Sequence, residues 1–214
     1  AVTQVGDYIF RVCFIDPFQG EVMAKFAANT LKAKKAAIML DFNSPYSRGL
    51  TEFFEASFKK LGGTIVDKQS YTQGDRDYKG QLTAIRSASP DVIYVPGYYG
   101  EVGVIAKQAQ QLGIKSPMLG GDGWDATQLW ELGGDALNGD FISNHYSVDD
   151  PSPAIQKFVA EYQGRYNKRP DALAALGYDA MKVLAEGIKA AGTTDGPKLR
   201  DAIAATKNFA GVTG

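Results

Sequence analysis

The sequence predicts an α/β protein in which helices cover both faces of a parallel β-sheet. A repeating unit carries this prediction: a short apolar run, then a turn, then a segment of helical period that often ends in Leu-Gly. At least four such strand-to-helix steps occur within the first 145 residues. Strands that alternate with helices favour a parallel sheet whose two faces are both buried.

Apolar runs and helical spacing place the individual elements. Strands are expected at residues 35–41, 64–71, 91–96, 116–121 and near 140–146. A helix over 47–61 puts Leu50, Phe53, Phe54, Phe58 and Leu61 on one apolar face, and Gly62 and Gly63 end it. Further helices are expected at 76–89, 101–113 and 125–134, the last with Asp125 as its N-cap.

The composition changes near residues 143–153, where a turn rich in Pro and Asp follows the last expected strand. Three helical segments then follow without intervening strands, at 153–168, 171–192 and 196–208. Their apolar stripes, which need a sheet to cover them, include Phe158, Leu184, Ile188 and Ile203. We therefore expect these helices to belong to a second lobe whose strands lie outside this sequence.

Composition limits the classes of partner and chemistry. The net charge of −1 over 214 residues gives no field that would attract nucleic acid or anionic lipid. No apolar run approaches the roughly 18 residues of a membrane helix, and the first ten residues do not resemble a signal peptide. Cys13 is the only cysteine, which excludes a disulfide or a thiolate metal cage within these residues. Because the sequence lacks an initiator Met, we expect an excerpt of a longer chain.

Aromatic and acidic residues follow three of the expected strands. Ligands of open parallel sheets gather beyond the carboxyl ends of the strands. A carboxylate beside aromatic rings suits a small ligand with an ammonium group, because the carboxylate accepts its hydrogen bonds and the ring faces attract cations. The residues at these strand ends are Asp41 and Tyr46, then Tyr98 and Tyr99, then Asp122 and Trp124.

Each of these residues also has an ordinary structural explanation. A loop Tyr or Trp often covers surface, an Asp after a strand often caps a helix, and Tyr46 could be turn packing after Pro45. Composition does not separate Tyr98 from Tyr99. The lone His145, at the expected lobe crossing, is expected to be structural, and Asp179 within a helix is expected to be solvated or to cap it.

Little in the sequence favours catalysis. It contains no dinucleotide- or phosphate-binding glycine motif, no HExxH and no nucleophile elbow. We therefore expect no enzyme, no catalytic residue, no bound metal and no cofactor. A sugar hydrolase that uses Asp41 and Asp122 as its two carboxylates is a weak alternative.

Six segments together resemble a known family. They are "FRVCFIDPFQG", "AAIMLDFNSPYSRGL", "DVIYVPGYYGEVG", "MLGGDGWDA", "DALNGDFISNHY" and "RPDALAALGYDAMKVLAEGI". Over all 214 residues, the chain is similar to bacterial periplasmic binding proteins for leucine, isoleucine and valine, of the type I fold. The resemblance implies two Rossmann-like lobes joined by three crossings, with the second lobe complete and the first partial. Residues 1–12 would end a first-lobe segment and cross over, 13–145 would form the second lobe, and 146–214 would be the helical part of the first.

The resemblance also implies roles for particular residues. Tyr98 would contact the amino end of the ligand, Asp122 would pair with the α-ammonium, and Tyr46 would close the cleft. Phe18 and Trp124 would line the same site. Three features depart from the family pattern. Its acid is often Glu, so the shorter Asp122 implies a shifted ligand or an intervening water. Trp124 replaces a smaller residue, and an aromatic residue of the family's pocket is absent around residues 172–174. Residues that bind the α-carboxylate would lie before the start of this sequence.

The implied function is capture of an aliphatic or other zwitterionic amino acid for import, with lobe closure as the working step. The partners would be the amino acid and an ABC transporter permease in the membrane. The full-length protein is expected to be a monomer, periplasmic or lipid-anchored outside the cell, made with a signal peptide. One alternative is a ligand-sensing module of the same fold in a regulator or receptor. Another is a sugar-binding protein, since Trp, Tyr and Asp also suit sugar rings.

Overall fold

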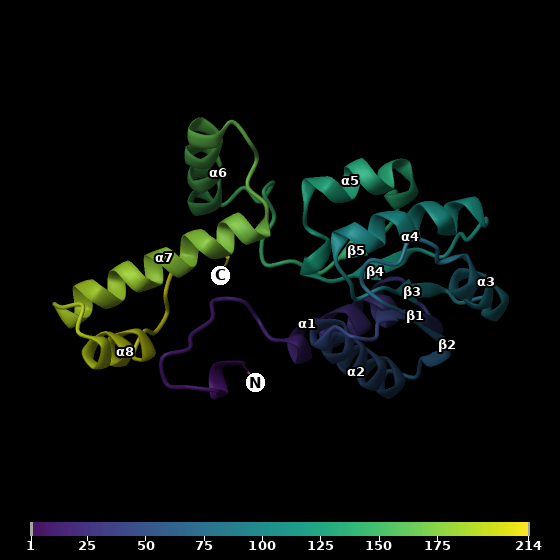
Figure 1. Cartoon of the computed structure of the whole chain (residues 1–214), viewed down its shortest axis with the longest axis horizontal. Coiled ribbons are helices and arrows are strands. Elements are labelled where there is room, and N and C mark those ends of the chain that lie inside the picture. The colour runs from purple at the N-terminus through teal and green to yellow at the C-terminus, as the bar shows by residue number, and fades with distance from the viewer. Residues whose placement is uncertain (1, 214) are drawn as a thin grey trace. The chain divides into compact units, whose positions relative to one another are not determined.

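The computed structural model describes residues 2–213, which divide into two compact units. The sheet unit comprises Phe14–Asn144. The helical unit comprises the described residues up to Cys13 together with those from His145 onward. Figure 1 shows the elements of each unit. The assignment of these residues to the lobes of a complete protein stays a prediction.

The sheet unit contains the predicted parallel sheet. Its strands are β1 (Lys35–Asp41), β2 (Thr64–Tyr71), β3 (Val92–Tyr94), β4 (Met118–Gly120) and β5 (Phe141–Ile142). Every neighbouring pair is parallel, and the strand order is β2-β1-β3-β4-β5. The α/β fold with a parallel sheet is therefore confirmed.

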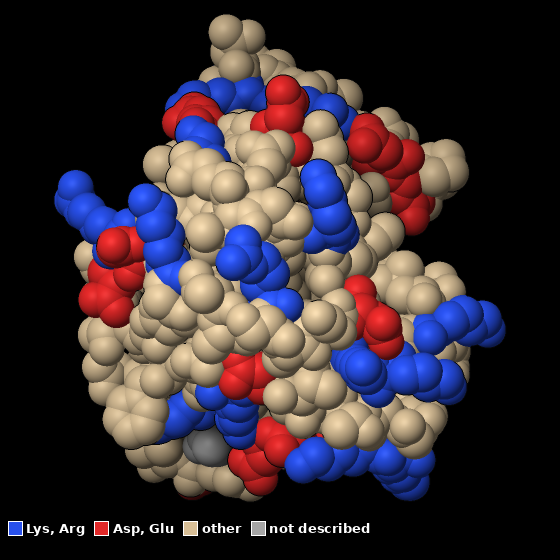
Figure 2. Space-filling view, turned by 90° about the vertical axis from the view of Figure 1, so that its right-hand side faces the viewer, with Lys and Arg blue, Asp and Glu red and all other residues tan. Residues whose placement is uncertain are grey.

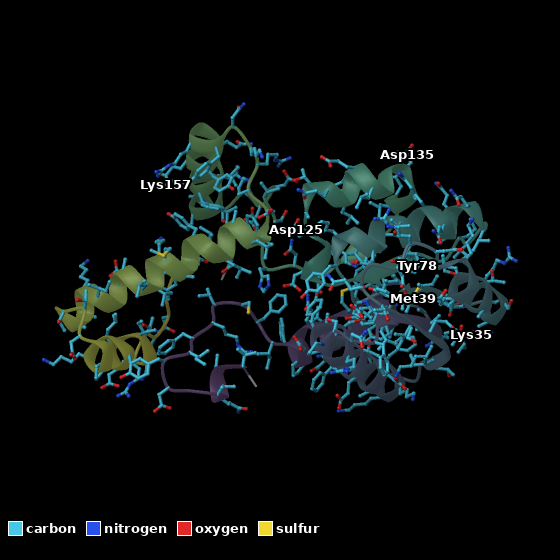
Figure 3. All side chains as sticks on the ribbon, in the orientation of Figure 1. Lys35, Met39, Tyr78, Asp125, Asp135 and Lys157 are labelled. Carbon is cyan, nitrogen blue, oxygen red and sulfur yellow. The ribbon has the colours of Figure 1, made fainter. Side chains whose placement is uncertain are left out.

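Helices cover both faces of this sheet (Figure 1). They are α1 (Asp16–Lys25), α2 (Pro45–Lys60), α3 (Lys79–Ala88), α4 (Tyr99–Gln111) and α5 (Thr127–Gly133), with short turns η2 (Phe26–Thr30), η3 (Asp122–Trp124) and η4 (Gly134–Leu137). The two faces of β1 show how the layers form, because successive side chains of a strand point to opposite sides. Ile38 packs with α1 and α2, whereas its neighbour Met39 packs with α3, α4 and Tyr78. Met39 and Tyr78 are labelled in Figure 3.

Helix α1 was not predicted from the sequence. Its buried residues are Gln19, Gly20, Met23 and Ala24, a face too polar and too small to show a clear apolar period. Gly20 explains how α1 approaches α2, since a Cβ atom there would lie 2.8 Å from the Cβ of Phe53. The predicted N-cap of α5 was also wrong: Ala126 occupies that position, and Asp125 instead accepts a hydrogen bond from the amide of Asn144 at 3.0 Å.

The helical unit contains η1 (Val2–Gln4), α6 (Pro153–Tyr166), α7 (Ala172–Ala191) and α8 (Gly196–Ala204). Phe158 does not need a sheet to cover it, contrary to the expectation, because it is 3% exposed among Val159, Ala175 and Val212. Leu184 and Ile203, by contrast, line an apolar groove of about 790 Å³.

Asp179 is buried rather than solvated, which corrects the expectation from its helical position. It is 1% exposed and accepts hydrogen bonds from the backbone N–H of Val212 at 3.0 Å and of Thr213 at 2.8 Å. The Thr213 hydroxyl donates a third bond at 2.7 Å. The carboxylate therefore ties the segment after α8 to α7.

The surface of the sheet unit carries mixed charge. Figure 2 shows basic and acidic side chains interspersed on the face turned to the viewer, as expected for a net charge of −1. Between residues 2 and 213, no helix has both the length and the apolar character to cross a membrane.

Candidate functional site

The candidate site lies beyond the carboxyl ends of the central strands of the sheet unit. Tyr46 follows β1, Tyr98 follows β3 and Asp122 follows β4. From β1 the chain passes outward to β2 and then returns to place β3 on the other side of β1. The order of the strands therefore reverses between β1 and β3, and open α/β sheets bind ligands at such a switch point.

Tyr46 links the three strand ends. Its hydroxyl donates a hydrogen bond to Oδ1 of Asp122 at 2.8 Å and accepts one from the backbone N–H of Gly123 at 3.1 Å. Its ring stacks on the ring of Tyr98, with centroids 5.2 Å apart and planes 28° apart. The structure thus brings together the carboxylate and two of the rings singled out from the sequence.

The local sequence explains why Tyr46 stands at this point. Ser44 caps α2, since its hydroxyl accepts from the backbone N–H of Ser47 at 3.2 Å, and Pro45 occupies the first helical turn. Asp41 is buried and serves the turn, because its Oδ1 accepts from the backbone N–H of Asn43 at 3.0 Å. Because Asp41 is taken up by this turn, the geometry does not support a sugar hydrolase that uses Asp41 and Asp122 as its two carboxylates.

The two adjacent tyrosines have different surroundings. Tyr98 precedes α4, is 45% exposed and stacks on Tyr46. Tyr99 is the first residue of α4. Of the pair, Tyr98 therefore belongs to the cluster with Tyr46 and Asp122. Phe18 lies on α1 with 57% of its surface exposed, and its ring meets that of Phe14 at 5.9 Å.

Trp124 takes a place different from the expected one. Its side chain is 2% exposed in the core of the sheet unit, and its indole N–H donates to the carbonyl oxygen of Val95 at 3.0 Å. The backbone of Gly120 touches the indole so closely that a Cβ atom there would overlap it. The ring therefore supports the loop after β4 from beneath and presents no open face to a ligand.

Sequence reasoning missed Gln19. This α1 side chain is 2% exposed, and its amide nitrogen donates to Oδ1 of Asp122 at 2.9 Å. The two residues are 103 positions apart. The sole sequence signal was a polar residue in a segment not recognised as a helix, so no local pattern could have revealed the contact.

Electrostatics keep both tyrosines neutral. Burial raises the pKa of Tyr46 far above its usual range, and the nearby negative charge of Asp122 adds to the effect. The pKa of Tyr98 is also raised, first by burial and then by Asp122 and Asp16. The hydroxyls therefore remain protonated near neutral pH. A carboxylate beside such rings can hold a cationic group by hydrogen bonding and by contact with the ring faces.

A doubly covered parallel sheet with a carboxylate and stacked rings at its switch point is the arrangement expected of a domain that binds a small ligand. The chain matches the model of the periplasmic binding protein family over residues 2–214 and belongs to that family. Members of this family carry ligands and are not enzymes.

Two solved structures and one curated relative illustrate the similarity. The leucine-binding protein LivK from Thermotoga maritima MSB8 is 44% identical with a TM-score of 0.94, over 99% of this chain and 61% of that one. LivJ, the branched-chain amino acid transporter substrate-binding protein from Streptococcus pneumoniae, in complex with isoleucine, is 33% identical with a TM-score of 0.92, over 99% and 60%. The Leu/Ile/Val-binding protein homolog 3 of Brucella melitensis is 33% identical over 187 residues, which are 87% of this chain and 50% of that protein. The chain thus spans about half the length of the curated relatives it matches.

Proposed function

We propose that the full-length protein captures an amino acid, branched-chain or otherwise aliphatic, and delivers it to an ABC importer. The observation that carries the proposal is the carboxylate of Asp122, which Tyr46 holds at 2.8 Å beside the stacked ring of Tyr98. This group would accept hydrogen bonds from the ligand's α-ammonium. The names of the relatives supply the ligand class, since they refer to leucine, isoleucine and valine.

Roles follow for the individual residues. Asp122 would contact the ammonium directly, Tyr98 would present its ring face and hydroxyl, and Tyr46 would hold Asp122 in place. Phe18, exposed on α1, would supply apolar contact. Trp124 would not touch the ligand, and its buried indole would support the loop that carries Asp122.

The setting of the protein is part of the same proposal. A binding protein that serves an importer works outside the cytoplasmic membrane, in the periplasm or tethered by a lipid, and its precursor carries a signal peptide. The permease would be its partner, and the carrier itself would be a monomer. Lobe closure around the ligand stays a prediction from the family resemblance. A helix-turn-helix segment in the full-length sequence would instead favour the ligand-sensing regulator.

Calorimetric titration of the full-length protein tests the proposal. We expect leucine, isoleucine or valine to bind, and 4-methylpentanoate, which resembles leucine without its ammonium group, to bind far more weakly. Asp122→Ala should weaken amino-acid binding by roughly thirtyfold to several thousandfold, because a desolvated ammonium group loses its partner. Tyr98→Phe should cost less, since the ring face remains.

A matched control is Asp135→Asn. Asp135 is an exposed carboxylate in η4, near the start of β4 and thus at the opposite edge of the sheet. This variant should bind leucine like the wild type. Binding by Asp122→Ala within about twofold of wild type would remove Asp122 from the site and contradict the proposal.

A further inference from the structure

Gln19 is a buried amide whose contacts bridge distant parts of the sheet unit. Its Nε2 donates to Oδ1 of Asp122 at 2.9 Å and lies 3.4 Å from the carbonyl oxygen of Ser143. The orientation of the amide follows from chemistry, because carboxylate and carbonyl oxygens accept and only the NH₂ end can donate to both. A single side chain on α1 therefore reaches both the loop after β4 and the residue after β5.

Two donors converge on one oxygen of Asp122. Gln19 and the hydroxyl of Tyr46 both donate to Oδ1, at 2.9 Å and 2.8 Å. They come from different helices, α1 and α2. Bonds from two directions to the same oxygen restrict rotation of the carboxylate about its Cβ–Cγ bond, which sets where the whole group points.

The backbone beneath Asp122 is shaped around these donors. A Cβ atom at Gly121 would lie 2.5 Å from the Tyr46 hydroxyl and 3.0 Å from Nε2 of Gln19. Only glycine therefore lets the loop come close enough for both bonds to form. The need for glycine at position 121 is a second observation beside the hydrogen-bond distances. It concerns the same two side chains, Gln19 and Tyr46.

We infer that Gln19 is a positioning residue, which aims the carboxylate of Asp122 at the ammonium group of the ligand; the inference rests on the proposed function. The choice of an amide has a physical reason. Gln19 and Tyr46 are neutral donors, so they orient Asp122 without offsetting its negative charge. Lysine or arginine at position 19 would instead compete with the ligand's ammonium for that charge.

The test is a double-mutant cycle in the full-length protein, with leucine as the probe and calorimetry as the readout. Gln19→Met keeps the length of the side chain but cannot donate, and should weaken leucine binding about tenfold. In an Asp122→Asn background the same change should cost less than about twofold, because Gln19 acts through the carboxylate.

The matched control is Gln108→Met. Gln108 makes similar contacts on α4: it accepts from the backbone N–H of Tyr78 at 2.7 Å and donates to the carbonyl of Arg76 at 2.8 Å. This variant should lose stability but keep leucine affinity within about twofold of wild type. If Gln19→Met does not fold, Gly121→Ala tests the contacts to Asp122 from the loop, since its methyl group would overlap the Tyr46 hydroxyl and crowd Nε2 of Gln19.

The outcomes separate the inference from the proposed function. Equal losses for Gln19→Met in the two backgrounds, or no loss in the wild-type background, would overturn the positioning role while leaving the function standing. If Gly121→Ala is the variant used, the same two results overturn that role. Failure of the wild type to bind leucine, isoleucine or valine, or full binding by Asp122→Asn, would overturn the proposed function and the inference with it.

Discussion

Replacing Asp140 by asparagine should flatten the pH dependence of unfolding of the sheet unit. Asp140 precedes β5, and its Oδ1 accepts from the backbone N–H of Met118 at 2.7 Å. Its Oδ2 is buried and has no hydrogen-bond partner among the described residues. Burial raises the pKa of this carboxyl to about 7, although the bond from Met118 acts in the opposite direction.

The sign of the effect follows from proton linkage. The pKa in the folded state lies above the unfolded value of about 4, so folding favours the protonated form. The stability contributed by this preference is complete below about pH 4 and is lost as the pH rises through about 7. With a folded pKa of about 7, the loss between pH 5.5 and 8 would be about 2 kcal/mol. Because the carboxyl group is partly exposed, we expect about 1 kcal/mol.

Urea unfolding at pH 5.5 and pH 8, followed by tryptophan fluorescence, measures this loss. Trp124 and Trp130 are the only tryptophans of the chain and both belong to the sheet unit, so the signal reports that unit. Wild type should lose stability toward pH 8, whereas Asp140→Asn should change little. Asp135→Asn, which alters an exposed carboxylate in a pocket that Asp140 also lines, should behave like wild type. Asp135 is labelled in Figure 3. An identical pH dependence for wild type and Asp140→Asn would refute the reasoning.

Three further changes test the packing. Asp179→Ala should destabilise the segment after α8 by about 2–4 kcal/mol, because three donors lose their acceptor. Hydrogen exchange at Val212 and Thr213 should speed up, and unchanged protection would show that Asp179 does not hold this segment. Tyr71→Phe should leave stability in urea unchanged or raise it by up to about 1 kcal/mol, since the buried hydroxyl has no partner among the described residues; a clear loss would show that the hydroxyl is bonded. Gly97→Ala should cost about 1–3 kcal/mol, because its Cβ would overlap that hydroxyl oxygen. Adding Tyr71→Phe should recover most of this loss, and equal costs in both backgrounds would argue against the overlap.

Much of the sheet unit could be predicted because its signals are local. The apolar run of β1 spans Lys35–Asp41, as expected from the sequence, and β2 spans Thr64–Tyr71. Of the five residues expected on the apolar face of α2, Leu50, Phe54 and Phe58 are fully buried, whereas Leu61, just after the helix, is 37% exposed. Such periods reflect the geometry of a single element, so they can be recognised without knowing its neighbours.

The meeting of the candidate residues could also be predicted, because the carboxyl ends of parallel strands lie at one edge of a sheet. This rule brings Tyr46, Tyr98 and Asp122 to the same edge, although 76 positions separate Tyr46 from Asp122. It does not determine how far each side chain reaches. Trp124 was expected in the site by the same rule, yet its indole lies in the core with a bond to Val95.

The sequence by itself therefore determined the alternation of strands and helices and the parallel sheet, and it brought the candidate site residues to one edge of that sheet, since each depends on short-range period or on chain order. Only the tertiary structure decided which donors meet at Oδ1 of Asp122 and which carboxylates are buried. Gln19 and Asp179 make contacts across 103 and 34 positions of the chain. Such contacts form between elements whose approach is set by packing, by glycines such as Gly20 and by strand order. No local pattern records them, because a side chain's partner depends on where the rest of the chain folds.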